Sequence, residues 1–156
     1  MTTTLIGLDH QQSQQLAQTL NHLLANYQVL YMNTRGYHWN IKGKAFFELH
    51  GKFEEIYTDL QTKIDELAER ILTLGAQPLH SFSHYLQATD IQEHINATDA
   101  QTCMQGLVSG FSTLISQQRA ILAIAADIGD EGTSAQMGDY IREQEKLVWM
   151  LNAWLQ

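Results

Sequence analysis

The sequence predicts an all-α protein built as a four-helix bundle, and three observations support this fold class. Apolar residues recur at helical spacing along four long segments of the chain. No segment shows the alternation of apolar and polar residues that is typical of a strand. Turn-forming residues, such as Gly43, Gly75 and Gly129, separate the segments. With 156 residues and 44% hydrophobic content, we expect one domain, residues 1–156, with a buried core.

The first two predicted helices form a hairpin. The first runs from about Asp9 to His38 and carries an apolar stripe of Leu16, Leu20, Leu23, Leu24, Tyr27, Leu30 and Tyr31. The second runs from about Lys44 to Leu74, and Gly75 with Pro78 just beyond it ends the helix. Its stripe consists of Leu49, Phe53, Ile56, Leu60, Ile64, Leu67, Ile71 and Leu74.

A long connection and two further helices complete the bundle. The connector of roughly 22 residues should contain a short helix, because long structureless loops are uncommon in compact domains. Capping boxes at Thr98 with Gln101, and at Thr133 with Gln136, predict the starts of the last two helices. Two helical hairpins with one long crossover, between helices two and three, make a bundle of ferritin-like connectivity. The two last stripes are Leu107, Phe111, Leu114, Leu122 and Ala125, and Met137, Tyr140, Ile141, Val148 and Leu151.

The charge balance argues against nucleic acid as the main partner. Nine Lys and Arg stand against 17 Asp and Glu, and the net charge is −8. The first basic residue is Arg35 and the last is Lys146, so neither end carries a cationic arm. Because sequence-independent DNA binding depends on Lys and Arg that neutralise phosphates, it should be weak here. A single Cys103, no signal peptide and no apolar run of membrane-spanning length predict a cytoplasmic protein without a membrane partner.

Five side chains between positions 38 and 69 form a candidate metal-ligand set: His38, His50, Glu54, Asp65 and Glu69. Two imidazoles with three carboxylates offer mixed nitrogen and oxygen ligands. Such a set suits a borderline divalent ion such as Fe(II) better than Ca(II) or a thiolate-bound zinc.

Helical geometry places four of these ligands on one face but at two locations. At ~100° per residue, His50, Glu54, Asp65 and Glu69 fall within about 100° of arc. Fifteen residues separate His50 from Asp65, about 22 Å of helix, whereas metal–ligand bonds span only ~2.0 to 2.2 Å. If the helix meets its own copy antiparallel across a twofold axis, the two halves face each other. The spacing therefore predicts two equivalent metal sites, each shared between two subunits.

His38 can join the His50 half only if the chain reverses between them. Residues 40–43 (NIKG) supply such a turn, in which Gly43 accepts a positive φ. Proteins of ferritin-like connectivity usually hold two metals inside each bundle through Glu-x-x-His motifs. The sequence contains no Glu-x-x-His, which favours the site between subunits.

Two sequence patterns make the sequence resemble the Dps family of mini-ferritins, the DNA-protecting proteins of starved bacteria. The first pattern comprises His38, Trp39, Asn40, Ile41 and Gly43, followed by Leu49, His50 and Glu54. The second comprises Ile64, Asp65, Leu67, Ala68, Glu69, Arg70, Leu74, Gly75 and Pro78. The patterns cover about a quarter of the chain, and the order of helices covers nearly all of it.

The resemblance implies a function as well as a fold. It implies a hollow shell of twelve subunits that oxidises Fe(II), preferentially with hydrogen peroxide, and stores ferric mineral, protecting DNA from oxidative damage. His38, His50 and Glu54 of one subunit, with Asp65 and Glu69 of its twofold mate, would be the catalytic ligands for two iron ions per ferroxidase site. Zinc is a substitute metal for the same ligands. The expected location is the bacterial cytoplasm, where the shell can associate with the nucleoid.

The resemblance also suggests roles outside the ligand set. Trp39, next to a ligand, would intercept stray oxidising equivalents. Acidic residues near the start of the last helix line threefold pores in the family, and Asp130, Glu131 and Asp139 lie in the matching region. Ala135 stands where many relatives carry Asp, which predicts a less acidic pore. Members that bind DNA directly often use a lysine-rich terminal arm, which this sequence lacks, so we expect protection through iron chemistry.

Alternative interpretations remain open at this stage. The same ligands could sequester zinc or another divalent ion in a noncatalytic shell. The second alternative is a DNA-compacting architectural protein, which the negative net charge disfavours. His80 and His84, four residues apart, could chelate zinc if both lie on one helix. Cys103 is expected to be a buried hydrophobe, because nothing nearby in sequence would activate its thiolate.

Overall fold

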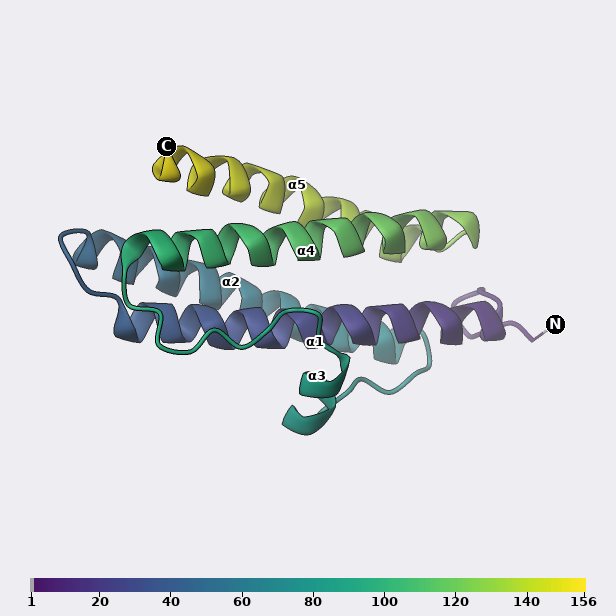
Figure 1. Ribbon diagram of the computed structural model, residues 1–156. Coiled ribbons are helices and arrows are strands. Elements are labelled where there is room, and N and C mark those ends of the chain that lie inside the picture. Colours follow the sequence, from purple (N-terminus) through teal and green to yellow (C-terminus); the bar gives the residue numbers. More distant parts are fainter. Residues whose placement is uncertain (1) are drawn as a thin grey trace.

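The computed structural model describes residues 2–156 and confirms the all-α fold class. Four long helices run side by side, and a short fifth helix lies outside the bundle against the first (Figure 1). Among the described residues there is no strand, only an isolated β-bridge between Thr3 and Asp9. The helices are α1 (His10–Asn40), α2 (Phe46–Thr73), α3 (Phe82–Ala88), α4 (Ala100–Asp127) and α5 (Glu131–Leu155).

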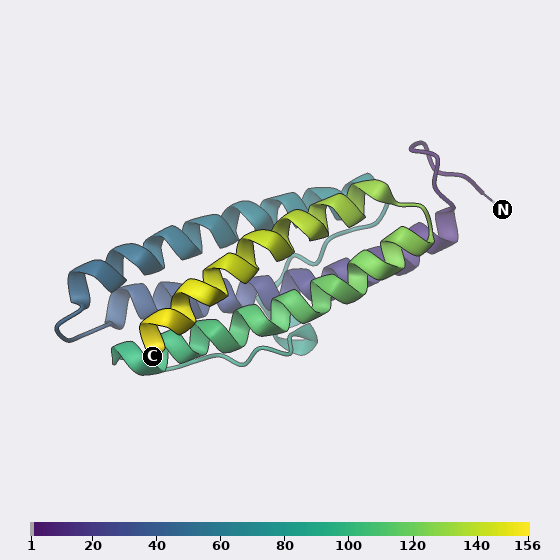
Figure 2. The ribbon, with the colours of Figure 1, turned by 90° about the horizontal axis from the view of Figure 1, so that it is seen from above.

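The bundle consists of two helical hairpins, α1 with α2 and α4 with α5, which share one core. Seen from above, α5 crosses the bundle between α2 and α4 (Figure 2). The predicted apolar stripes face this core, although four of their members are only partly buried: Tyr31, Ile64, Leu122 and Val148. The connector between the hairpins contains α3, as predicted. Within residues 2–156, no helix is long and apolar enough to cross a membrane.

The starts of α4 and α5 differ from the predicted capping boxes, which are wrong. Asp99 caps α4 by accepting a hydrogen bond from the Thr102 N–H, and Asp130 caps α5 in the same way through Thr133. Thr98 instead uses its carbonyl to accept the N–H of Lys42, which ties the start of α4 to the α1–α2 turn. An Asp carboxylate is an N-cap at least as good as a Thr hydroxyl, and here it displaces the neighbouring Thr from that role.

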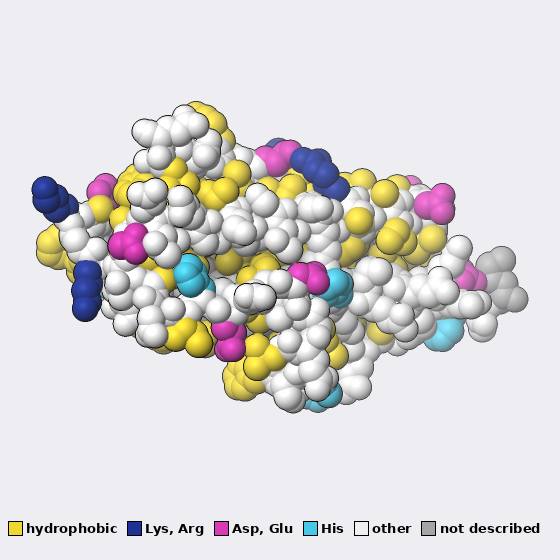
Figure 3. Space-filling model, in the orientation of Figure 1, with side chains coloured by type: hydrophobic (Ala, Val, Ile, Leu, Met, Phe, Trp, Pro, Cys, Tyr) yellow, Lys and Arg dark blue, Asp and Glu magenta, His cyan; other side chains and the backbone are white. Residues whose placement is uncertain are grey.

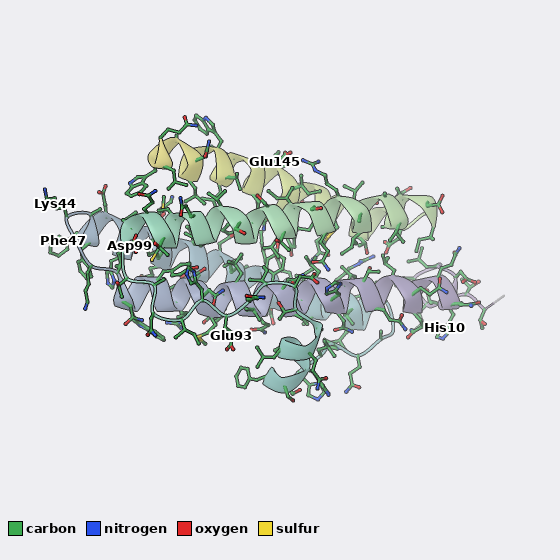
Figure 4. The ribbon with its side chains drawn as sticks, in the orientation of Figure 1. His10, Lys44, Phe47, Glu93, Asp99 and Glu145 are labelled. Carbon is green, nitrogen blue, oxygen red and sulfur yellow. The ribbon has the colours of Figure 1, made fainter. Side chains whose placement is uncertain are left out.

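The α1–α2 turn reverses the chain as the sequence predicts. Gly43 has a φ of +118°, a conformation that side chains with a Cβ rarely adopt. The turn projects Lys44 and Phe47 from one end of the bundle, whereas His10 lies at the opposite end (Figure 4). As a result, the last turn of α1 lies directly beside the first turns of α2, where His38 and His50 are placed.

Candidate metal centre

His38 and His50 hold each other in one tautomer. The Nδ1 atom of each ring lies 2.7 Å from the main-chain carbonyl oxygen of the other residue. Because a carbonyl oxygen only accepts, each Nδ1 carries the proton and donates it. In a neutral imidazole this leaves Nε2 with a free lone pair, which is the arrangement that metal-binding histidines commonly show.

Neighbouring rings fix the orientation of both imidazoles. The two rings are stacked with centroids 3.8 Å apart, and Phe46 stacks on the outer face of His50 at 4.9 Å. Tyr57 meets His38 edge-on at 5.3 Å. His38 is only 6% exposed, so its ring has little freedom to turn away. The two Nε2 atoms are therefore pre-oriented before any metal binds.

Glu54 adds an oxygen ligand to this pair. It lies one helical turn after His50, and its Oε1 is 3.9 Å from Nε2 of His38. That separation is too long for a hydrogen bond. Two ligand atoms that each bind one metal ion at ~2.1 Å lie roughly 3 to 4.2 Å apart. The distance between Glu54 Oε1 and His38 Nε2 falls in this range, so one metal ion fits between these two atoms. We call His38, His50 and Glu54 the histidine half-site.

Asp65 and Glu69 form a second, separate group one turn apart on α2, which we call the carboxylate half-site. The pKa of Glu69 is raised, first by a hydrogen bond with the Asp65 side chain and then by the negative charge of Asp65. Two carboxylates this close repel each other, and a divalent cation bound between them would remove that repulsion.

One chain does not bring the five predicted ligands together. Among residues 2–156 there is no group of three or more His, Cys, Asp or Glu side chains able to hold a metal ion. The structure stacks His38 on His50 and places Glu54 near His38, and it leaves Asp65 and Glu69 about four turns beyond His50 on the same helix. Each half-site is therefore incomplete by itself.

The carboxylate half-site borders a groove between α1, α2 and the connector. The groove has a volume of about 970 Å³, and its lining includes Leu24, Tyr31, Ile64 and Asp65. Large apolar side chains beside it are exposed, among them Met32, Phe82 and Leu86. Figure 3 shows such side chains gathered over α3 and its neighbours. This side of the molecule offers an apolar surface next to the carboxylate half-site.

Comparisons with known proteins agree with this architecture. A family model described as a ferritin-like domain matches residues 17–156. A structure of a Dps protein from Vibrio cholerae O1 is 73% identical, with a TM-score of 0.99, and covers 100% of this chain and 98% of that one. The chain belongs to the Dps family. A Dps protein from Bacillus brevis is 35% identical, with a TM-score of 0.90 over 94% of this chain and 98% of that one.

Curated sequences place the chain in the same family. A "DNA protection during starvation protein" from Porphyromonas gingivalis is 43% identical over 95% of this chain and 93% of its own length. An uncharacterised protein from Haemophilus influenzae is 59% identical over 98% and 96%. The V. cholerae Dps is described as a member of the ferritin-like diiron-carboxylate superfamily. Membership of the Dps family implies iron storage and DNA protection, and the diiron-carboxylate fold implies iron binding.

The predicted pore residues of this Dps chain occupy different surroundings. Asp130 is only 2% exposed, and its carboxylate accepts hydrogen bonds from Arg70 and from the Thr133 N–H and hydroxyl. These contacts make it a helix cap and an ion-pair partner, with no free carboxylate edge. Glu131 and Asp139 are exposed on α5 and remain candidates for lining a pore.

Two histidines do not form the chelate considered from their spacing. Ser81 is the N-cap of α3, so His80 lies before the helix and His84 within it. The Nδ1 of His80 is hydrogen-bonded to the carbonyl of Pro78. The four-residue spacing therefore does not place both rings on one helical face.

The bundle interior of this Dps chain holds a cation of its own. Lys63 is 4% exposed, and its Nζ lies 2.7 Å from Asp59 and 2.8 Å from Glu143. Nearby, Tyr27, Gln118 and Gln144 form a buried hydrogen-bonded chain. Sequence reasoning missed this network, because Asp59 and Lys63 at a four-residue spacing look like an ordinary surface pair.

A cluster of aromatic rings around Arg35 was also missed. The guanidinium carbon lies 4.3 Å from the ring centroid of Tyr57, 5.4 Å from that of Trp39 and 5.7 Å from that of Tyr31. The spacing of residues 31, 35 and 39 on one face of α1 was the available signal. The contribution of Tyr57 from α2 required the structure.

Proposed function

We propose that the chain is a ferroxidase that oxidises Fe(II), preferentially with hydrogen peroxide, at sites shared between twofold-related subunits. The ferric product is stored as mineral in a hollow shell, and this removes the reactants that damage DNA. The observation that supports this best is the histidine half-site, in which both imidazoles have a free Nε2 and that of His38 lies 3.9 Å from Glu54, while the remaining ligands lie elsewhere. The absence of a complete ligand cluster among residues 2–156 favours completion by a second copy.

Iron is the substrate of this reaction. His38, His50 and Glu54 of one subunit would bind Fe(II) together with Asp65 and Glu69 of its twofold mate, two ions per site. Two Fe(II) ions supply two electrons, and hydrogen peroxide with two protons accepts them to give two water molecules. Pairing the ions matters, because a single Fe(II) gives peroxide one electron and releases a hydroxyl radical. The carboxylates at 54 and 69 can change their binding mode as the charge on iron rises.

Twelve subunits would form the shell, as the resemblance implies. The apolar surface beside the groove, with Met32, Phe82 and Leu86, is suited to a twofold contact that buries it. Glu131 and Asp139 would line the route of iron uptake. Trp39 would intercept stray oxidising equivalents, and an unchanged radical yield in Trp39→Phe would remove this role. With a net charge of −8, we propose protection in the bacterial cytoplasm by iron chemistry, without direct coating of DNA.

The experiment adds Fe(II) anaerobically to metal-free protein, injects hydrogen peroxide and follows ferric formation. Size-exclusion chromatography then shows whether iron travels with a particle of shell size. We expect about two Fe(II) oxidised per peroxide, and a loss of more than about tenfold in rate for His50→Ala. His10→Ala, at an exposed histidine outside both the ligand set and the proposed contact, is the matched control and should keep the full rate. Zinc binding without oxidation beyond the buffer rate would instead favour the noncatalytic shell.

A further inference from the structure

Arg35 and three aromatic rings form one contact group, which we call the Arg35 cluster: Arg35, Tyr31, Trp39 and Tyr57. Besides the three ring contacts, the Arg35 Nε donates a hydrogen bond of 3.1 Å to the Tyr31 hydroxyl. Tyr31 and Tyr57 also meet edge-to-face at 6.1 Å. The guanidinium is therefore held over electron-rich rings by several contacts from two helices. A guanidinium remains protonated at any pH the protein encounters, so its charge is permanent.

The Arg35 cluster lies against the histidine half-site. Tyr57 contacts the His38 ring edge-on at 5.3 Å, and Trp39 follows His38 directly in the chain. Tyrosine and tryptophan are the side chains that most readily lose one electron without a metal. Trp39 is also 59% exposed, so an oxidant that leaves the half-site can reach it. A site that handles peroxide beside these rings puts them at risk of oxidation.

Removing an electron from an aromatic ring creates positive charge on that ring. A permanent cation 4 to 6 Å away repels the positive charge of the oxidised ring. The same cation is attracted to the quadrupole of the neutral ring and stabilises that state. We propose that Arg35 makes Trp39 and Tyr57 poorer electron donors, so that mild one-electron oxidants take electrons from this cluster more slowly, while strong ones such as the hydroxyl radical still react. Arg35 thereby acts as a positioning residue that sets the oxidation threshold of the rings.

The electron balance of the step is simple. A hydroxyl radical that escapes the site accepts one electron from the Trp39 ring and becomes hydroxide, and the ring becomes a radical cation. Weaker oxidants have less driving force, so the charge of Arg35 slows their reaction with the ring. The source of the oxidant rests on the proposed function, whereas the effect of Arg35 on the rings does not, so the two can fail separately.

The test therefore uses the full chain without added iron and a mild, neutral oxidant, the nitrogen dioxide radical. This radical takes one electron and leaves as nitrite, and its neutrality removes any effect of Arg35 on its approach. Peptide mass spectrometry measures modification of Trp39 relative to Trp149, which is 67% exposed and serves as an internal reference. For Arg35→Met we expect the ratio to rise roughly two- to fourfold, the effect of one unit charge at this distance in water.

Three controls separate charge from packing. Lysine and methionine have similar length but differ in charge, so Arg35→Lys should keep the ratio near that of the unmodified chain. At about 1 M salt the Debye length shrinks to ~3 Å, and the unmodified chain should then approach the Met variant. Arg119→Gln removes a cation that pairs with Glu145 and stacks on no ring in the described part of the chain; it should change nothing. Equal ratios in the Lys and Met variants, or an unchanged ratio in Arg35→Met, would overturn the proposal.

Discussion

Asp99 and Asp130 cap two helices by the same hydrogen bond but in different surroundings. Asp99 is exposed, whereas Asp130 is buried and also pairs with Arg70 at 2.7 Å. Asp130→Ala removes a cap and leaves a partly buried guanidinium without its partner, so we expect a loss of about 2 to 4 kcal/mol in the free energy of unfolding. Denaturant unfolding measures it. Asp99→Ala, which loses the cap alone, should cost clearly less, and equal losses would mean that the Arg70 pair contributes nothing.

Cys103 shows how burial changes the chemistry of a single residue. Burial raises the pKa of its thiol to about 11. An unfolded thiol titrates near ~8.5, so between about pH 8.5 and 11 the unfolded chain releases a proton that the native chain retains. The unfolded state then binds fewer protons, and the free energy of unfolding should fall as pH rises through this window. Stability measured from pH 8 to 10.5 should fall less steeply for Cys103→Ala, and identical slopes would contradict the prediction.

At the scale of helices, the close crossing of α1 and α4 depends on Gly110. A Cβ built there would lie 2.5 Å from Leu30 Cδ1, inside van der Waals contact. Gly110→Ala should therefore destabilise the protein by about 1 to 3 kcal/mol, although Ala is the better helix former. Thermal unfolding compares it with Gly138→Ala in α5, where the nearest atom is 3.9 Å away. That control should be neutral or stabilising by up to about 1 kcal/mol, and a similar loss at both sites would show that crowding is not the cause.

The helices were predictable from sequence to a greater degree than their ends. Periodicity located all four long helices, because burial of one face in 3.6-residue register leaves a direct trace in the residue order. The ends depend on single hydrogen bonds that several neighbouring side chains can make. Thr98 and Asp99 are both competent caps, and only the structure shows that Asp99 takes this role while Thr98 contacts Lys42 through its carbonyl.

At the scale of the whole molecule, spacing predicted that the ligands divide into two groups, because rise per residue alone fixes that separation. The tautomers of His38 and His50 could not be predicted, since each depends on a carbonyl brought across the turn. The burial of Asp130 was equally hidden, because its partner Arg70 is 60 residues away in the chain. Residues that act across helices leave no periodic pattern in the sequence.

Sharing of ligands between subunits can be tested by mixing two inactive variants. His50→Ala damages the histidine half-site, and Asp65→Asn damages the carboxylate half-site. In a mixed dimer, one of the two sites combines the damaged halves, and the other combines two intact halves. Random assembly of equal amounts makes half of the dimers mixed, so about a quarter of the sites recover all of their ligands. We expect peroxide-dependent Fe(II) oxidation to recover to about that fraction after joint refolding.

The control refolds each variant separately and mixes the finished particles without exchange of subunits. Because no new dimers form, this mixture should stay as inactive as its components. Sites completed within one chain would give no recovery in either case, since every chain carries a damaged residue. Recovery only after joint refolding would thus place the two half-sites on different subunits, and an inactive refolded mixture of correct particle size would refute the shared site.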